Sequence, residues 1–419
     1  MMLSRLKLKL KRYAKQALYV CGILYERALH IVSPRDAKDV ILGVAGYHVF
    51  FGYYDVTPFS KDGKTVLACR TDLELISPGS NREIEFGYYD LANGGGEIFH
   101  CFAKSVAWCW QQGARLQWMP GHDERLVFFN SRSDSGQYEG VIFDIARKQT
   151  VTTLIRPLYD ISKDGRWGLS LDFSRLQRLR PGYGYDASAD VTSNNPVPPG
   201  ACLELVDIKE NQIVFSLAYE ELLAFEPVAD MQGAEHYINH LSFSPSGNRF
   251  IFFHMWVSNA KRSSRLLLVE RSSGSVTLLN NSGKCSHYAW NSDQALLVYC
   301  APTRGEPIGY NLYDLDHPTQ SPTRVGQGVL MEDGHPSFLP EGRRFLTDTY
   351  PNRFGRQTLM LFDMPSSQLI WTRSLFRSRK YNGEVRCDLH PRLDYTAKQV
   401  CVDDEYKGER VMRIIKIDV

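Results

Sequence analysis

A unit of about 50 residues recurs seven times after Ser33, and this repetition constrains the fold more than any other feature. The clearest copies contain an apolar strand, a turn with glycine, and a second strand of β-branched or aromatic residues. One copy has HLSF at 240–243, Gly247 and RFIFF at 249–253, and another has HPSF at 335–338 before Gly342. Short strands at this spacing, separated by turn residues, are typical of β-propellers.

Most units continue into a third strand that ends in an acidic turn. The acidic residues are Asp90, Asp144, Asp207, Asp314, Asp363 and Asp418. Such strands are expected to enter a hairpin to an outer fourth strand. Seven units lie within the range of known propellers. We therefore predict an all-β fold in which residues 36–419 form one seven-bladed β-propeller, preceded by a short N-terminal basic helix.

Residues 1–35 differ from the rest of the chain because six basic residues precede the first acidic one, Glu26. The apolar stretch between them, residues 17–25, is too short to span a bilayer as a helix. We predict a basic amphipathic helix over residues 1–35 that rests on an anionic membrane surface or packs on the propeller. An export signal or an anchor stays open as an alternative, although no small-residue cleavage site follows.

Composition limits the compartment and the partners. The chain has nine cysteines and no C-x-x-C pair, which favours a reducing compartment. We expect a cytoplasmic protein that can also associate with the inner face of the membrane through residues 1–35. The net charge of +2 gives no reason to expect a nucleic-acid partner. The sequence contains no P-loop, no G-x-G-x-x-G after a strand and no G-x-S-x-G, which argues against the common nucleotide-binding and serine hydrolase classes.

Four successive units carry histidine at one equivalent position, three residues before the apolar residue that precedes the turn. These are His240, His287, His335 and His390, and the other units have Val56, Arg115 and Leu158 there. The first strand of each propeller blade runs along the central channel, so equivalent positions are expected to form a ring. A ring of imidazoles can bind a transition metal or transfer protons near neutral pH. The structural alternative is a set of channel histidines that only hydrogen-bond trapped water.

Two insertions interrupt the repeat, at residues 71–82 and at residues 172–200. The second contains Arg175, Arg178, Arg180, Tyr183 and Tyr185. Long loops without their own secondary structure are usually functional or disordered. Arginine pairs with carboxylates and aromatic rings stack on sugars, so the insertion predicts a site for an anionic, ring-shaped ligand. A solvated linker with incidental charge is the alternative interpretation.

Short segments around the four histidines are similar to those of a known family. The segments 240–245 (HLSFSP), 286–290 (SHYAW), 333–338 (DGHPSF) and 388–392 (DLHPR) resemble the channel strands of oligogalacturonate lyase. The resemblance is best over the last four units. It implies a seven-bladed propeller that binds Mn²⁺ through histidines and cleaves an unsaturated digalacturonate by β-elimination.

The resemblance also implies roles for individual residues. A divalent metal, with Mn²⁺ the first choice, is expected to be bound by His287, His335, Asp388 and His390. Asp388 lies two residues before His390 and would face the same side of a strand. The family pattern Gln-x-x-His-x-His reads Val385, Asp388 and His390 here, so a carboxylate replaces one histidine and Val385 cannot ligate.

In the family an arginine is the proposed base that removes the C5 proton of the uronate. Arg180 is the first candidate for that arginine here and Arg175 the second, and His240 is a further catalytic candidate. The candidates for substrate binding are Arg115, Arg178, Tyr183 and Tyr185.

Three functions remain open at this point, and whether the chain is an enzyme is not decided. The first is a metal-dependent protein that cleaves or binds a uronate-containing oligosaccharide at the central channel, by β-elimination if it is catalytic. The second is a non-lyase propeller, peripheral to the membrane, in the biosynthesis of a cell-surface polysaccharide such as capsule, O-antigen or exopolysaccharide. The third is a protein-interaction scaffold, because a propeller fold does not determine function.

Overall fold

The computed structural model describes residues 39–92, 95–122 and 124–417, together with six residues nearer the N-terminus. Those six are Tyr13, Ala14, Ala17, Val20, Cys21 and Leu24, and all are helical and exposed. The remainder of the predicted basic helix, residues 1–35, lies outside the described residues. Among the described residues, no helix has the length and the apolar character needed to cross a bilayer.

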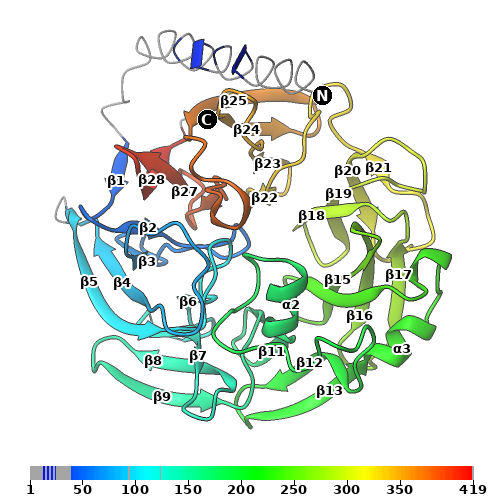
Figure 1. The fold of residues 1–419 in the computed structure, drawn as a ribbon. Helices are drawn as coiled ribbons and strands as arrows, with labels where there is room; N and C mark the ends of the chain where they lie inside the picture. Colours follow the sequence, from blue (N-terminus) through cyan, green and yellow to red (C-terminus); the bar gives the residue numbers. More distant parts are fainter. Residues whose placement is uncertain are drawn as a thin grey trace, which may run out of the picture.

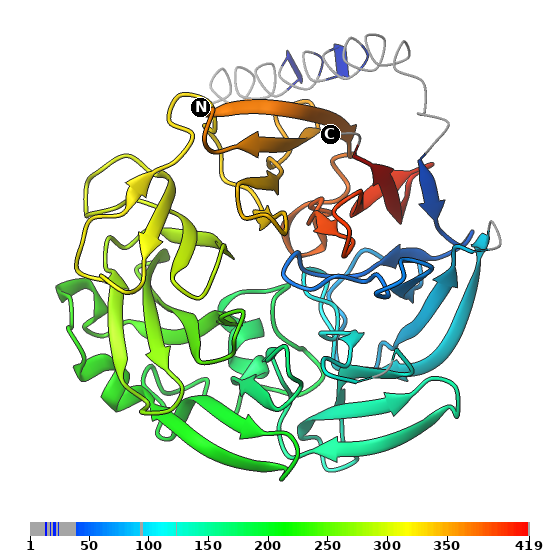
Figure 2. The same ribbon diagram turned by 180° about the vertical axis from the view of Figure 1, so that it is seen from behind.

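The described chain forms seven antiparallel sheets of four strands, arranged as blades around a ring (Figure 1, Figure 2). This confirms the predicted all-β, seven-bladed propeller. Blades one to three contain β2 (His48–Phe50), β3 (Thr65–Thr71), β4 (Ile84–Asp90) and β5 (Gly95–Ser105); β6 (Gln117–Trp118), β7 (Leu126–Arg132), β8 (Tyr138–Asp144) and β9 (Gln149–Leu154); β10 (Asp160–Ile161), β11 (Trp167–Ser170), β12 (Ala201–Asp207) and β13 (Gln212–Ala218).

Blades four to six follow the same order. They contain β14 (Glu235–Phe243), β15 (Arg249–Ser258), β16 (Lys261–Glu270) and β17 (Val276–Asn280); β18 (Cys285–Trp290), β19 (Ala295–Cys300), β20 (Gly309–Asp314) and β21 (Thr323–Arg324); β22 (Ser337–Phe338), β23 (Arg344–Thr347), β24 (Arg356–Asp363) and β25 (Gln368–Phe376). Short helices occur between strands: α2 (Phe173–Leu179), α3 (Tyr219–Ala224), η1 (Ala229–Met231) and η2 (Gly383–Val385).

Blade seven is built from both ends of the described chain. It contains β26 (Arg392–Leu393), β27 (Gln399–Tyr406) and β28 (Glu409–Lys416), and its outer strand is β1 (Val40–Leu42). β1 pairs antiparallel with β28, with Val40 opposite Ile414. The sequence predicted that the last third strand would enter a hairpin to its own fourth strand. That prediction is wrong for blade seven, because the N-terminal strand takes the outer position and closes the ring.

The acidic residues at the ends of the third strands stabilise the hairpins that follow. Asp144 Oδ1 accepts hydrogen bonds from the backbone nitrogens of Ala146 and Arg147 at 3.0 and 2.9 Å. Asp207 Oδ1 accepts one from Glu210 N at 3.2 Å. These bonds satisfy turn donors that the ladder cannot reach, which explains why an acidic residue recurs at this position.

A buried ion network joins blade seven to blade one. Asp403 on β27 accepts hydrogen bonds from Arg392 at 2.7 Å and from Arg410 at 2.9 Å, and all three side chains are fully buried. Phe51, which follows β2, donates its backbone N–H to Asp403 at 3.3 Å. The Arg410 guanidinium lies 4.5 Å from the ring centre of Phe50. One carboxylate therefore compensates two buried cations at the seam where the ring closes.

A second buried network contains two neutral histidines of blade four. Arg265 Nε donates to His254 Nδ1 at 2.9 Å, so the His254 Nε2–H is left to donate to His236 Nδ1 at 2.9 Å. The His236 Nε2–H then donates to the carbonyl of Met231 at 3.0 Å. Every ring nitrogen in this chain of bonds has one defined role, so a proton added to either ring would break it. Burial, opposed only in part by the bond to Met231, lowers the pKa of His236 to about 4.

This network predicts a loss of stability in mild acid. The pKa of His236 is lower in the folded state than the ordinary value of 6.5, so below that value the unfolded state binds more protons. The contribution is fully present at pH 8, and by pH 5 it has fallen by about 2 kcal/mol. Urea unfolding of the wild type and of His236→Gln at both pH values should show the smaller pH dependence in the variant. Equal pH dependence in the two proteins would contradict this role of His236.

Candidate metal centre

The structure brings the four predicted histidines together in the order of their blades. The ring centres of His240 and His287 lie 6.0 Å apart, those of His287 and His335 4.4 Å, and those of His335 and His390 4.4 Å. Their exposed fractions lie between 0 and 7%. Imidazoles that are about fifty residues apart in sequence therefore form one buried cluster at the centre of the ring, as the repeat register predicted.

An unusual backbone conformation recurs at the register position. His240, His390 and Arg115 have φ angles of +54°, +45° and +57°, in the left-handed region. In β14 the ladder is irregular between Asn239 and Ser242, which flank His240. A residue with a side chain in this region costs free energy and persists only where the surroundings enforce it. Three blades therefore share this conformation at the register position, and such strain is concentrated at functional sites.

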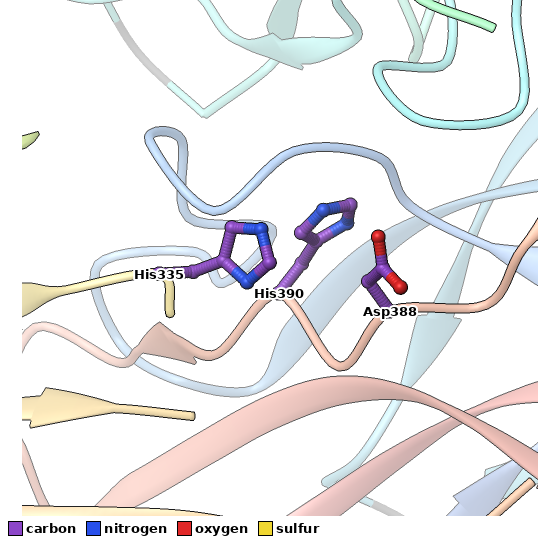
Figure 3. A group of neighbouring side chains, drawn as sticks. All are labelled: His335, Asp388 and His390. Atoms are coloured by element: carbon purple, nitrogen blue, oxygen red, sulfur yellow. The ribbon is translucent and has the colours of Figure 1, made fainter. Parts of the chain in front are cut away.

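Three of the clustered side chains form a set that suits a metal ion. The ligand atoms of His335, Asp388 and His390 all lie within 4.8 Å of one another (Figure 3). His335 Nε2, both ring nitrogens of His390 and Asp388 Oδ1 are buried and have no hydrogen-bond partner among the described residues. Buried polar atoms normally have partners, so a group that binds one of these atoms from each side chain would supply partners that the protein lacks. Two imidazoles and a carboxylate fit Mn²⁺ or another first-row divalent ion.

Carboxylates orient two of the histidines by accepting hydrogen bonds from Nδ1, the ring nitrogen that does not face the cluster. His335 Nδ1 lies 2.9 Å from Asp348 Oδ1, so Nδ1 carries the proton and Nε2 presents its lone pair to the cluster. The adjacent blade repeats this arrangement, with His287 Nδ1 2.9 Å from Asp333 Oδ1. Pairs in which a carboxylate holds the distal nitrogen of a histidine are typical of metal ligands.

The charges of the three candidate ligands differ. Burial and the nearby His335 lower the pKa of His390 well below its ordinary value, so its ring is neutral. Burial opposes ionisation of Asp388, but Arg386, His335 and Arg377 together outweigh it and lower the pKa of the carboxyl. Burial also opposes charge on His335, whereas Asp348 raises its pKa. A proton and a metal would compete for His335 Nε2, so the affinity for a metal should fall as the pH is lowered.

Two tyrosines that the sequence analysis did not identify complete the cluster. The ring centre of Tyr53 lies 4.9 to 6.4 Å from those of all four histidines. Tyr54 packs on His287 and His335, and its hydroxyl donates to the carbonyl of Tyr288 at 2.8 Å. The Tyr53 hydroxyl is buried and has no hydrogen-bond partner among the described residues.

The two tyrosines reach the cluster because blade one contains an insertion. Phe50 is opposite Cys69 and Phe59 is opposite Val66, so nine positions on one strand match three on the other. The extra residues loop into the channel and displace Val56, which lines a cavity at the channel end instead of occupying the histidine ring. The aromatic run FFGYY at residues 50–54 was the signal in the sequence that could have revealed these tyrosines. It lies in the first unit, where the repeat alignment fails.

The insertion at residues 172–200 is ordered, in contrast to the predicted loop without secondary structure. Asp172 caps α2 by accepting from the backbone nitrogens of Ser174 and Arg175. Tyr185 stacks on Phe173 with ring centres 4.2 Å apart and is fully buried. α2 lies over the central region of the ring in Figure 1. The aromatic residues fold the insertion onto the propeller, which leaves Tyr185 in the core.

Two of the predicted arginines are engaged away from the histidines. Arg175 is buried and donates to the carbonyls of His236 at 2.7 Å and Pro196 at 2.8 Å. Arg178 forms ion pairs with Asp190 at 2.7 Å and Glu235 at 2.6 Å. These contacts hold the insertion in place.

Arg115 lies at the register position of blade two but is paired. It forms two hydrogen bonds to Asp55, of 3.1 and 2.9 Å, and its guanidinium lies 4.5 Å from the ring centre of Tyr159. In blade three, Leu158 packs in an apolar cluster and takes no part in the histidine ring. Of the register positions that were predicted to form a ring, those of the four histidines lie together, and Arg115 lies beside them.

Arg180 and Tyr183 are the residues of the insertion that lie next to the histidines. Tyr183 packs on His240 with ring centres 6.0 Å apart, and its hydroxyl accepts a hydrogen bond from Arg386. The Arg180 guanidinium lies 4.8 Å from the Tyr183 ring centre. Arg386 also donates to Asp388. These cations place positive charge at the side of the cluster covered by the insertion. Val385, which stands where the family pattern has its glutamine, packs in the core.

The three comparisons with known proteins gave one kind of match. No protein-family model matches the chain, and no curated protein matches it. A solved oligogalacturonate lyase in complex with manganese is similar at 13% identity and a TM-score of 0.59, over 89% of this chain and 91% of that one. The oligogalacturonate lyase of Vibrio parahaemolyticus also has 13% identity and a TM-score of 0.59, over 92% and 95% of the chains.

A third structure, the β-propeller domain of the trilobed protease of Pyrococcus furiosus, has 10% identity and a TM-score of 0.50, over 88% and 93% of the chains. Identities this low establish the shared fold only. The blade count, the extent of the overlap and the structural match agree with the resemblance found in the sequence. The chain has the seven-bladed propeller fold of the oligogalacturonate lyases.

Proposed function

We propose that the chain binds a divalent transition metal through His335, Asp388 and His390, and that it cleaves a uronate-containing oligosaccharide by β-elimination. One observation carries the proposal: the three side chains are buried, each has an unpaired polar atom, and one ligand atom from each lies within 4.8 Å of the other two. The likeness to a manganese-bound oligogalacturonate lyase supports the choice of metal and of substrate class.

The bound metal would act as a Lewis acid on the uronate carboxylate and acidify the neighbouring C5–H bond. Burial, His287 and Arg180 lower the pKa of His240 well below its ordinary value, so its neutral ring can accept the C5 proton. Burial raises the pKa of Tyr53 well above its ordinary value, so its hydroxyl keeps a proton to donate. The C4–O bond breaks, a C4=C5 double bond forms, and the leaving oxygen takes the proton of Tyr53.

The two arginines on the insertion side of the histidine cluster suit an acidic substrate. Arg180 and Arg386 lie on the side covered by the insertion, where a carboxylate could pair with them. The same contacts close the cluster, since Arg386 is bonded to both Tyr183 and Asp388. Entry of an oligosaccharide therefore requires that the contact between Arg386 and Tyr183 opens.

The closed cluster also favours a second candidate, a propeller that binds metal and glycan without cleaving them. Such a protein would serve cell-surface polysaccharide biosynthesis at the inner membrane face, held there by the basic segment of residues 1–35. This alternative keeps the metal site and omits the elimination step.

A turnover assay tests the proposal and separates the two candidates. We expect that Mn²⁺-loaded protein mixed with short oligogalacturonates releases a product with a C=C bond conjugated to the carboxylate, detected by ultraviolet absorbance. His390→Asn should lose this activity, whereas Trp371→Leu on the outer strand β25 should keep it. If the loaded wild type binds manganese but forms no unsaturated product from any uronate oligosaccharide, the elimination step is wrong.

A further inference from the structure

The channel contains a second concave site, on the other side of the tyrosines from the insertion. A cavity of about 580 Å³ is lined by residues that follow the register position in their blades, such as Ser242, Ala289 and Ser337. The insertion contacts residues that precede this position, such as Gln111 and Arg386. The cavity and the insertion therefore lie at opposite ends of the channel. Its volume is in the range of about 300–1,000 Å³ that small-molecule sites occupy.

Tyr54 separates this cavity from the histidines. Its ring lines the inner end of the cavity and also packs on His287 and His335, with ring centres 5.9 and 5.2 Å away. Its hydroxyl is fixed by hydrogen bonds with both the carbonyl and the N–H of Tyr288. None of the four histidines lines the cavity. The cavity is thus a compartment of its own.

Buried polar atoms at the inner end of this compartment have no partner. The Gln117 side chain is 4% exposed, and its Nε2 makes no hydrogen bond to any described residue. Tyr288 is 2% exposed, and its hydroxyl lies near Ser242 without a hydrogen bond of normal geometry within the described ranges. Asp160 uses one carboxylate oxygen to accept from Phe243 N at 2.7 Å. Donors and a carboxyl oxygen are left for a ligand that both accepts and donates hydrogen bonds.

Aromatic rings form the walls around these polar atoms. The indole N–H of Trp118 donates to the carbonyl of Pro58 at 3.0 Å, and that of Trp290 to Ser242 Oγ at 3.1 Å. With their polar edges occupied, these tryptophans contribute apolar surface to the cavity. A mixture of aromatic surface and unpaired hydrogen-bonding groups suits a ligand with an apolar face and a hydroxyl-bearing edge.

The charges around the cavity favour an uncharged ligand. Glu124 balances one of the two lysines at its lining, Lys61 and Lys163, and Asp160 balances the other in part. Asp55 is neutralised by its ion pair with Arg115. Burial, with the nearby Asp55, raises the pKa of Asp160 to about 7, so near neutral pH this carboxyl can donate as well as accept. The described lining residues leave less than one unit of net charge, which is too little to select an anion or a cation.

We infer that this end of the channel binds an uncharged pyranose, the terminal unit of a neutral glycan, between Trp118 and Trp290 with its hydroxyls on Gln117, Asp160 and Tyr288. The site is separate from the metal centre and does not depend on the proposed lyase activity. It would hold a neutral glycan at the end of the channel opposite Arg180 and Arg386, the cations that suit an acidic glycan.

Saturation-transfer NMR on the full chain tests this site. The probes are the methyl β-glycosides of glucose, galactose and N-acetylglucosamine, and at least one is expected to bind with a Kd of order 1 mM. Gln117→Leu and Trp290→Leu should each weaken that binding by about tenfold or more. The matched control Trp371→Leu, on an outer strand of blade six, should bind as the wild type does. Protein treated with a chelator should also bind equally well.

Three results would overturn the inference. The first is no saturation transfer from any of the three glycosides at tens of millimolar. The second is unchanged binding in both folded variants, as judged by their circular dichroism. The third is loss of binding after chelation, which would place the sugar at the metal centre. A failed lyase assay would leave all three measurements unaffected, so the two proposals can fail independently.

Discussion

Replacing Asp403 by asparagine is expected to lower the free energy of unfolding by about 3–5 kcal/mol. Asp403 compensates the buried guanidinium groups of Arg392 and Arg410 at distances of 2.7 and 2.9 Å. Asparagine keeps the shape and can still accept a hydrogen bond, but it removes the negative charge. Two cations would then remain in the interior without compensation, and a buried charge that has lost its partner is among the most destabilising changes a single substitution makes.

Urea or guanidinium unfolding, followed by tryptophan fluorescence, measures this effect through the shift of the midpoint. Asp314→Asn is the matched control. Asp314 also pairs with a basic side chain, that of His317, but both side chains are exposed at a hairpin. That variant should hardly change the midpoint. A midpoint for Asp403→Asn close to that of the wild type would show that the network contributes little to closure of the ring.

The second large effect concerns the affinity for manganese. His335→Ala removes one of three candidate ligands and should reduce the affinity for Mn²⁺ by more than about 100-fold, since even residues behind the ligands contribute about 10–100-fold. Asp348→Asn keeps all three ligands but removes the carboxylate that holds His335 Nδ1. It should reduce the affinity by about 10–100-fold.

Titration calorimetry with Mn²⁺ measures both variants, and Asp333→Asn supplies the control. Asp333 holds His287 in the same way that Asp348 holds His335, one blade earlier. Because His287 is not among the three convergent side chains, Asp333→Asn should change the affinity far less. Equal losses in Asp333→Asn and Asp348→Asn would make His287 a ligand and would contradict the three-residue site.

The sequence alone was sufficient for the blade count and for the meeting of the histidines. Both follow from the period of the repeat, because equivalent positions in successive blades face the same axis. His240, His287, His335 and His390 could be aligned since each lies at a fixed distance from a recognisable turn.

The features of the site that could not be predicted from the sequence depend on tertiary contacts. Tyr53 and Tyr54 lie in an insertion that breaks the alignment, so no register argument could place them. Arg175 looked available for a ligand because the backbone carbonyls that bind it come from segments up to 61 residues away. The roles predicted for the individual site residues remain predictions that the affinity and turnover measurements above can test.

Blade seven cannot be completed until the first strand of the chain meets the last, since Val40 pairs with Ile414. Asp388 and His390 precede β26 in that blade, whereas His335 belongs to blade six. Contacts between such distant segments form late in folding, after a large loss of chain entropy. The three candidate ligands therefore gather only once the segments of blades six and seven have come together, so uptake of the proposed metal would follow closure of the ring.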